Sequence, residues 1–178
     1  MPAETHNRHS IAFTEQVKDI IRISDIVLEL VDARHIDESR NPLIEEHVKN
    51  LGKKMIHVVT KADLVDVKIL QESHSFIRLI NPIIISATKK MGVGKLREKV
   101  IIESKRLKHD RKTHIAVVGY PNTGKSTLIN VLVRRNAAPV SSQPGWTKSI
   151  RKIRFNKDIL ILDAPGIIGE KENLFSGA

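Results

Sequence analysis

The chain has 178 residues, 40% of them hydrophobic and only 3% aromatic, with no cysteine and a formal net charge of +10. This length fits one ordinary domain whose core is built from isoleucine, valine and leucine, a composition that suits a buried parallel sheet. The absence of cysteine excludes a disulfide framework and a cysteine metal site, and no apolar run approaches the ~18 residues that span a bilayer, so we expect a cytoplasmic protein without a membrane partner.

The first half of the chain alternates helical and strand patterns. Apolar residues recur at helical spacing from Phe13 to Ile21, and the apolar run that follows predicts a buried strand. Asn41 and Pro42 form a typical helix start, because an Asn side chain caps the first turn and proline is well tolerated there. The expected elements are a helix over 13–21, a strand over 26–31, a helix over 42–51, a strand over 55–59, a helix over 65–79, a strand over 83–85 and a helix over 93–107.

Two polar motifs directly follow strands of this half. The first is Thr60-Lys61-Ala62-Asp63, and the second is Ser86-Ala87-Thr88. Ligands of open α/β sheets bind at the carboxyl ends of the strands. The two loops could therefore share one crevice.

The first motif has the chemistry of a guanine site. The Asp63 carboxylate can accept two hydrogen bonds, from guanine N1–H and from the exocyclic amine, whereas adenine would leave the carboxylate unpaired. The stem of Lys61 would lie along the base plane, and the backbone around Ser86 and Ala87 would donate to guanine O6. A lone Lys-x-Asp turn is also a common surface feature, and that interpretation stays open on this motif alone.

A charged stretch from Lys105 to Lys112 lacks the pattern of a buried element, and we interpret it as a connector. From Arg111 to Lys157 the chain carries ten lysine or arginine residues and no aspartate or glutamate. Such a surface attracts polyanions by counterion release, with nucleic acid the commonest partner. A solvated basic face that serves solubility is the alternative.

The segment after the connector has the pattern of a phosphate-binding loop. A strand from His114 to Val118 leads into Gly119-x4-Gly124-Lys125-Ser126, and a helix follows. The backbone N–H groups of such a loop wrap the phosphates, the lysine contacts the terminal phosphates and the serine hydroxyl ligates Mg²⁺. The expected nucleotide-binding residues of this loop are Asn122, Thr123, Gly124, Lys125, Ser126 and Thr127.

The last part of the chain combines a loop with a hairpin. Prolines, serines and a glycine over 136–146 predict a mobile loop that ends near Thr147, whose hydroxyl could close onto Mg²⁺ when a third phosphate is present. Strands over 149–155 and 159–162 form the predicted hairpin. Asp163-x-x-Gly166 follows, where the carboxylate can hold Mg²⁺ through water and the Gly166 N–H can reach a terminal phosphate.

Together these segments resemble the five signature motifs of the translation-factor class of GTPases, in the order base, base, P-loop, threonine loop and Asp-x-x-Gly. The usual order begins at the P-loop. The permuted order is similar to that of the circularly permuted ribosome-assembly GTPases of the YlqF (RbgA-like) family, as are the segments Val31-Asp-Ala-Arg34, Ser39-Arg-Asn-Pro42 and Pro144-Gly-x-Thr147.

This resemblance implies a circularly permuted P-loop GTPase domain: a doubly wound α/β fold with a mostly parallel sheet and helices on both faces. It implies GTP as substrate, GDP as product, Mg²⁺ as cofactor, and a ribosomal subunit or rRNA as partner. The domain would divide into a base-recognition half over about 11–104, a connector over about 105–113 and a phosphate-binding half over about 114–168.

Three features depart from the usual pattern. Thr60 replaces the more frequent Asn of the base motif, which would remove an amide that ties this loop to the P-loop. Ile167 stands where many GTPases carry a water-orienting Gln, so intrinsic hydrolysis should be slow. Family members continue into a helical RNA-binding domain, whereas this sequence stops at Ala178, so we expect a C-terminal domain to be missing.

Two residues could compensate for the absent Gln. Asn122 stands where potassium-stimulated GTPases carry Asn and could hold K⁺ beside the phosphates, although an ordinary turn-forming Asn is the alternative. His9 precedes the first helix, as a histidine does in the resembled family, and its neutral imidazole could orient or deprotonate water. His6 is a competitor, and a surface histidine without function is the alternative.

Two other functions stay open. With its basic segment and without the Gln, the chain could be an RNA-binding scaffold that holds nucleotide as a structural ligand without turnover. An ATPase is a further alternative, which Asp63 disfavours.

Overall fold

A mostly parallel β-sheet forms the centre of the protein, within the residues that the computed structural model describes, 15–133 and 150–163. In those residues the sheet has six strands in the order β3-β2-β1-β4-β6-β5, and β5 is the strand that pairs antiparallel to its neighbour. The strands are β1 (Ile26–Asp32), β2 (Lys54–Thr60), β3 (Ile83–Ile84), β4 (Thr113–Gly119), β5 (Arg151–Arg154) and β6 (Ile159–Asp163). The helices are α1 (Glu15–Ile23), α2 (Ile36–Ser39), α3 (Pro42–Asn50), α4 (Val67–Glu72), α5 (His74–Ile77), α6 (Val93–Arg106) and α7 (Lys125–Val133), with a 3-10 turn η1 (Ala62–Leu64).

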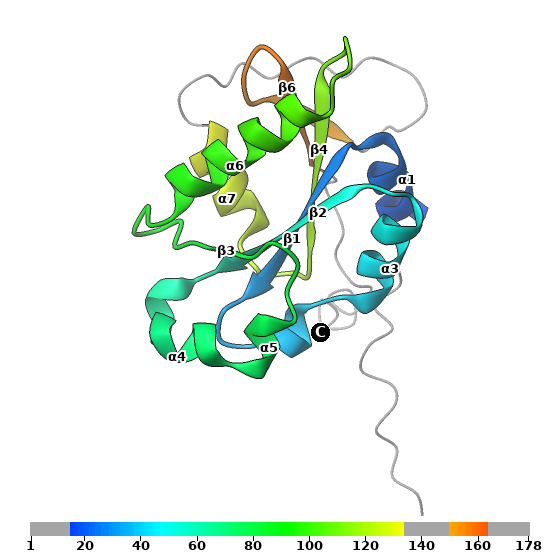
Figure 1. Ribbon diagram of the computed structural model, residues 1–178. Coiled ribbons are helices and arrows are strands. Elements are labelled where there is room, and N and C mark those ends of the chain that lie inside the picture. Colours follow the sequence, from blue (N-terminus) through cyan, green and yellow to red (C-terminus); the bar gives the residue numbers. More distant parts are fainter. Residues whose placement is uncertain (1–14, 134–149, 164–178) are drawn as a thin grey trace, which may run out of the picture.

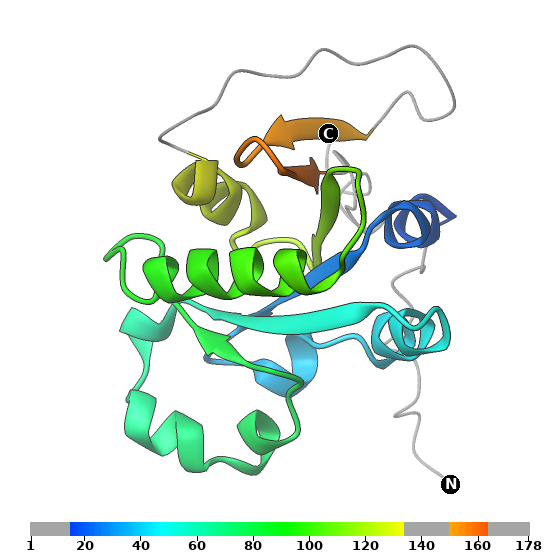
Figure 2. The ribbon, with the colours of Figure 1, turned by 45° about the horizontal axis from the view of Figure 1, so that its top comes forward.

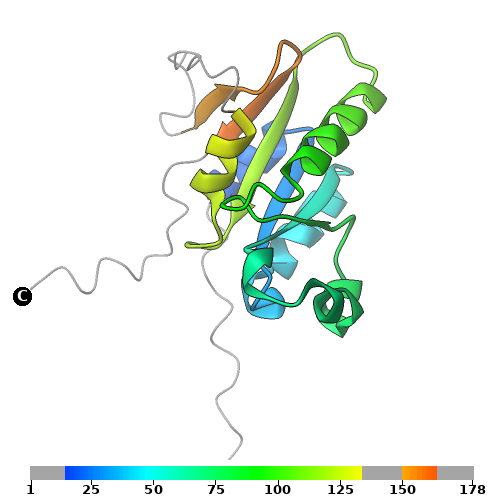
Figure 3. The ribbon, with the colours of Figure 1, turned by 90° about the vertical axis from the view of Figure 1, so that its left-hand side faces the viewer.

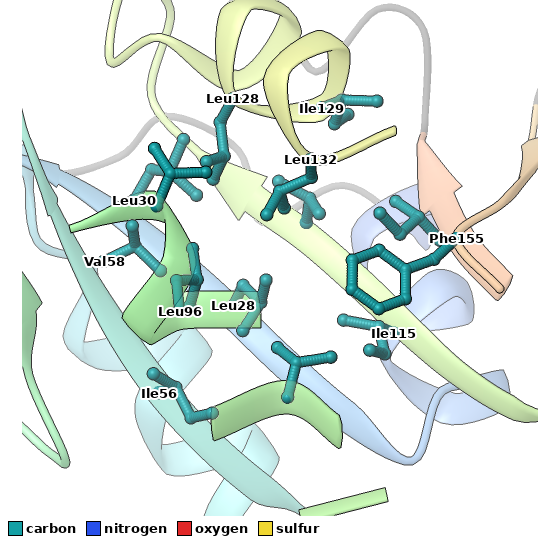
Figure 4. Packing of buried hydrophobic residues seen from close by; sticks show 14 of the residues in the cluster. Leu28, Leu30, Ile56, Val58, Leu96, Ile115, Leu128, Ile129, Leu132 and Phe155 are labelled. Carbon is teal, nitrogen blue, oxygen red and sulfur yellow. The ribbon is translucent and has the colours of Figure 1, made fainter. Parts of the chain in front are cut away.

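Helices cover both faces of this sheet (Figures 1, 2 and 3). On one face, α6 and α7 place Leu96 and Leu128 against Leu28 of β1 (Figure 4). On the other face, α1 and α3 pack against Val27, the neighbour of Leu28 in the same strand. Because successive strand residues point to opposite faces, a strand covered on both sides must be apolar almost throughout. The predicted doubly wound α/β fold is confirmed.

Polar side chains cap the starts of helices α3 and α5. The Asn41 side chain accepts hydrogen bonds from the N–H groups of Leu43 and Ile44 at 3.1 and 3.3 Å, so the predicted cap of α3 is present. The single helix predicted over 65–79 is wrong, because the structure has the two short helices α4 and α5 there. Ser73 separates them, and its hydroxyl accepts from the Phe76 N–H at 3.2 Å. A serine that caps a new helix competes with continuation of the preceding one.

The segment between α6 and β4 spans residues 107–112 and is anchored to the start of β1. Arg111 donates to both carboxylate oxygens of Asp25 at 2.6 and 2.8 Å, and the His114 N–H donates to the same carboxylate at 2.8 Å. Burial alone would raise the pKa of Asp25, but the hydrogen bonds from Arg111 and His114 outweigh burial and lower that pKa. Asp25 therefore joins the two halves of the chain as a carboxylate.

None of the helices in the described ranges is long and apolar enough to cross a membrane.

Arg111→Ala is expected to lower the free energy of unfolding at pH 7 by about 0.5–1 kcal/mol, because the Arg111 side chain is half exposed and exposed ion pairs contribute little. A lowered carboxyl pKa contributes stability above the unfolded-state value, and this stability is lost as pH falls through the folded-state value. The difference from wild type in urea unfolding should therefore shrink below about pH 4. Lys112→Ala is the matched control. If Arg111→Ala lowered the free energy of unfolding equally at all pH values, the ion pair with the Asp25 carboxylate would not be the cause.

Candidate nucleotide-binding site

The described loops that carry predicted motifs meet at one edge of the sheet. The strands β1, β2, β4 and β6 are parallel, so their carboxyl ends share this edge (Figure 3). In the ladder, Asp32 pairs with Thr60 and Leu30 pairs with Gly119. The base motif after β2 and the glycine loop after β4 therefore lie on either side of the end of β1.

The glycine loop between β4 and α7 needs its particular residues for steric reasons. A side chain at Gly119 would place its Cβ 2.9 Å from the Leu30 carbonyl oxygen, so the close approach of loop and strand requires glycine. Asn122 and Gly124 have φ angles of 64° and 94°, in a region that favours asparagine and glycine. Thr123 closes the turn, because its hydroxyl donates to the Tyr120 carbonyl at 2.7 Å. The backbone preferences of the loop residues and the close approach to Leu30 together fix the shape of this loop.

Lys125 begins α7 and folds back over this loop. Its ammonium donates to the carbonyls of Gly119 and Tyr120 at 2.9 and 3.3 Å. Burial lowers the pKa of Lys125, and burial raises the pKa of the half-buried Asp163 at the end of β6, which interacts electrostatically with Lys125. Ser126 follows Lys125 at the exposed start of α7. Two hard oxygen donors, the Ser126 hydroxyl and the Asp163 carboxylate, therefore stand beside the phosphate loop, and this donor chemistry fits Mg²⁺.

The structure also brings the two base motifs together. The Ala62 N–H donates to the Ile85 carbonyl at 3.1 Å, which joins the base loop to the end of β3. The Ser86 hydroxyl lies beside the exposed Asp63 carboxylate and lowers its pKa, with a smaller contribution from Thr88. Asp63 is therefore held as a carboxylate that can only accept hydrogen bonds.

Thr60 connects the base loop to the glycine loop. Its buried hydroxyl contacts the Thr123 carbonyl at 2.7 Å and the Val31 carbonyl at 3.1 Å. The expectation that threonine would lose the tie to the P-loop is therefore wrong. The shorter side chain keeps the connection because β1 and β2 end in register and the glycine loop turns toward them.

Thr60→Val is expected to weaken GDP binding by about fivefold to tenfold, because valine keeps the shape of threonine but leaves the buried Thr123 carbonyl without its donor. The measurement is a fluorescence titration with labelled GDP. Thr60→Ser retains the hydroxyl and should bind within about twofold of wild type. Wild-type affinity in Thr60→Val would show that the contact does not order the nucleotide site.

Asp32 is a residue of this edge to which the sequence analysis assigned no role. The last residue of β1, it binds Lys61 of the base motif and Arg34 of the following loop. A signal was present, since Asp32 is a charged residue at the end of a mostly apolar strand. The ion pair with Lys61 could not be predicted from the sequence, because the two residues are 29 positions apart and meet only when β1 and β2 pair.

A buried polar cluster on the α3 side of the sheet also combines possible metal ligands. Its members are Glu29, Glu45 and His57, whose ligand atoms lie within 4.8 Å of one another. Burial alone would lower the pKa of His57, but its hydrogen bonds with Glu29 and Glu45 raise that pKa to about 9, so Nε2 carries a proton at neutral pH. That N–H faces Glu29 Oε2 at 3.1 Å. A protonated Nε2 offers no lone pair to a metal, and we interpret the cluster as hydrogen-bonded core.

Three predicted site residues, His9, Thr147 and Gly166, lie outside the described residues. So does Ile167, the residue at the position of the usual Gln. The predicted residues that the structure describes come from four loops, and those loops meet at the carboxyl edge of the sheet.

This fold and this site define a P-loop GTPase domain. Counted from β4, the strand before the P-loop, the sheet order reads 6-5-4-1-3-2, with the second strand antiparallel. The spatial order of the strands is thus independent of the point where the chain begins. The domain is circularly permuted relative to GTPases that begin at the P-loop.

Residues 114–177 match the model of the 50S ribosome-binding GTPase family. The protein named ribosome biogenesis GTPase A from Bacillus pumilus is 34% identical over 92% of this chain and 61% of its own length. An uncharacterized GTP-binding protein of Methanocaldococcus jannaschii is 36% identical over 91% of this chain and 44% of its own length. The crystal structure of GNP-bound YlqF from T. maritima superposes with a TM-score of 0.57 at 28% identity, covering 86% of this chain and 57% of that one.

In sequence and in fold the chain is thus similar to the YlqF (RbgA-like) circularly permuted GTPases. It spans about half the length of the curated relatives it matches.

Proposed function

We propose that this protein binds GTP with Mg²⁺, hydrolyses it slowly to GDP and phosphate, and uses the bound nucleotide to regulate its attachment to a ribosomal particle. The observation that carries the proposal is the junction at Thr60, whose hydroxyl connects a guanine-type base loop to the P-loop at 2.7 Å. The names of the relatives, which include ribosome biogenesis GTPase A, support the ribosomal part.

One set of the described residues binds the base, and another set binds the phosphates and Mg²⁺. Asp63 accepts from the guanine N1–H and amine, Lys61 lies along the base, and the backbone at Ser86 and Ala87 donates to O6. Lys125 and the N–H groups at the start of α7 stabilise the negative charge that develops on the transferred phosphoryl group. Ser126, and Asp163 through water, would hold Mg²⁺, which when bound offsets phosphate charge. Water is the nucleophile.

We further propose that Thr147 and Gly166, which lie outside the described residues, contact the third phosphate, and that His9, which also lies outside them, positions the attacking water. Asn122 holds K⁺ beside the phosphates and so supplies positive charge that an arginine finger gives elsewhere. The left-handed backbone at Asn122 is equally expected of a turn-forming Asn, so the comparison of potassium with sodium chloride separates the two roles.

The partner surface is basic. In the described part of the chain, β5 is one of the two edge strands of the sheet, and its residues Arg151 and Arg154 are exposed. An exposed basic edge resists pairing with other strands and attracts phosphate backbones. We assign this edge to contact with rRNA.

GTP hydrolysis measured with and without purified ribosomal subunits tests the proposed function. A GTPase of this kind should turn over slowly alone, faster with subunits, and faster in potassium chloride than in sodium chloride at equal ionic strength. An RNA-binding scaffold would bind subunits without any stimulation of hydrolysis. An ATPase would exchange bound GDP for ATP as readily as for GTP.

A further inference from the structure

We propose that Asp32 is a positioning residue for the guanine base, and that it acts by holding the side chain of Lys61. The inference rests on the proposed function, since it assumes that the edge formed by Thr60 to Asp63 binds the base. It adds a residue outside the base motif to the determinants of nucleotide affinity.

The Asp32 carboxylate is held rigidly at the end of β1. Asp32 is buried and pairs in the sheet ladder with Thr60. Its Oδ1 accepts from the Arg34 N–H and from Arg34 Nε, both at 3.0 Å, and its Oδ2 accepts from Arg34 Nη2 at 2.7 Å. The Ala33 N–H donates to the Thr60 carbonyl at 3.0 Å, which fixes the backbone beside it. An aspartate with so many partners has no rotamer freedom left.

Lys61 is fixed against this anchor. Its Nζ lies 2.8 Å from Asp32 Oδ2. Its backbone has a φ of 58°, a left-handed conformation that few residues other than glycine adopt. The backbone and the terminal atom of Lys61 are thus both constrained, so its methylene stem is held between the base loop and the Asp32 carboxylate. A stem held in place before the nucleotide arrives loses little conformational entropy when the base packs on it.

The electrostatics keep the contact intact in solution. Hydrogen bonds from Arg34 and Lys61 hold the pKa of Asp32 well below its usual range. The carboxylate is therefore charged wherever the protein is folded near neutral pH, and the Lys61 contact does not depend on pH there. Two cations share this carboxylate, but Lys61 alone belongs to the base motif. Arg34 comes from the loop after β1, and its side chain is 41% exposed.

The test is a double-mutant cycle on the full chain, with N-methylanthraniloyl-GDP as the probe in fluorescence titrations. Asp32→Asn should weaken binding about fivefold to tenfold, the range expected when one flexible side chain must be immobilised on binding. In a Lys61→Ala background the same substitution should cause no further loss. Asp19→Asn, which removes a surface carboxylate that is paired with Arg22 in α1, is the control and should bind within about twofold of wild type.

A second readout separates positioning from general damage to the base loop. Because the Lys61 stem packs on the base plane and does not read the exocyclic amine, Asp32→Asn should weaken the inosine diphosphate analogue by the same factor as the GDP analogue. Distortion of the loop around Asp63 would instead weaken the GDP analogue and the inosine diphosphate analogue by different factors. If Asp32→Asn does not fold, Asp32→Ser serves in the same cycle, since its hydroxyl can still accept from the Arg34 N–H.

Wild-type affinity in Asp32→Asn, or a loss that is equal in the presence and absence of Lys61, would overturn the role of Asp32. Failure of the wild-type chain to bind the GDP probe would instead overturn the proposed function. The two failures are therefore distinguishable in one set of titrations.

Discussion

Lys125→Ala is expected to slow single-turnover GTP hydrolysis by about a hundredfold or more, the usual cost of removing one charged donor from a preorganised phosphate site. In the structure the Lys125 ammonium is folded over the loop, on the Gly119 and Tyr120 carbonyls, and it is half-buried. Its charge therefore acts in a region of low dielectric constant, where it stabilises developing phosphate charge more than a solvated lysine does. The rate is measured by rapid quenching with enzyme in excess over GTP.

The control for Lys125 is Lys95→Ala, which removes an exposed lysine from α6 on the same face of the sheet. That variant should hydrolyse GTP at the wild-type rate. An unchanged rate in Lys125→Ala would show that the loop after β4 does not bind the transferred phosphate. The structural interpretation of the glycine loop would then be wrong, whatever the affinity for GDP.

Asp63→Asn should change the preference between GTP and xanthosine triphosphate by about a hundredfold or more, because a site built on hydrogen bonds rejects a base that cannot complete them. Xanthine carries a carbonyl where guanine carries the amine, so an amide at position 63 can donate where a carboxylate can only accept. The Ser86 hydroxyl lowers the pKa of Asp63, which keeps the wild-type carboxylate ionised at neutral pH. Competition against labelled GDP measures the ratio.

Asp66→Asn is the matched control for this substitution. Asp66 lies three residues further along, where its exposed carboxylate accepts from the N–H groups of Lys68 and Ile69 at the start of α4. Asparagine caps helices as well as aspartate does, so this variant should keep both stability and guanine preference. Equal nucleotide preference in Asp63→Asn and wild type would remove Asp63 from the base site.

Much of this molecule follows from features that are local in sequence. Periodicity separates strands from helices, and strands that alternate with helices pair in parallel, so every loop after a strand end lies at one edge. The P-loop is a single short segment whose glycines set its backbone, which makes it recognisable without knowledge of any neighbour. The Asn41 cap and the permuted order of motifs were readable for the same reason.

The contacts that turn these motifs into one site were decided by the tertiary structure. Thr60 reaches a carbonyl 63 positions away, and Lys61 reaches Asp32 across 29 positions. Both contacts depend on strand order and on register, and a slip of one residue would turn these side chains to the opposite face. Residue type alone suggested that Thr60 loses its connection to the P-loop. The short distance between the ends of β1, β2 and β4 reverses that conclusion, because it brings a single hydroxyl within reach of the loop.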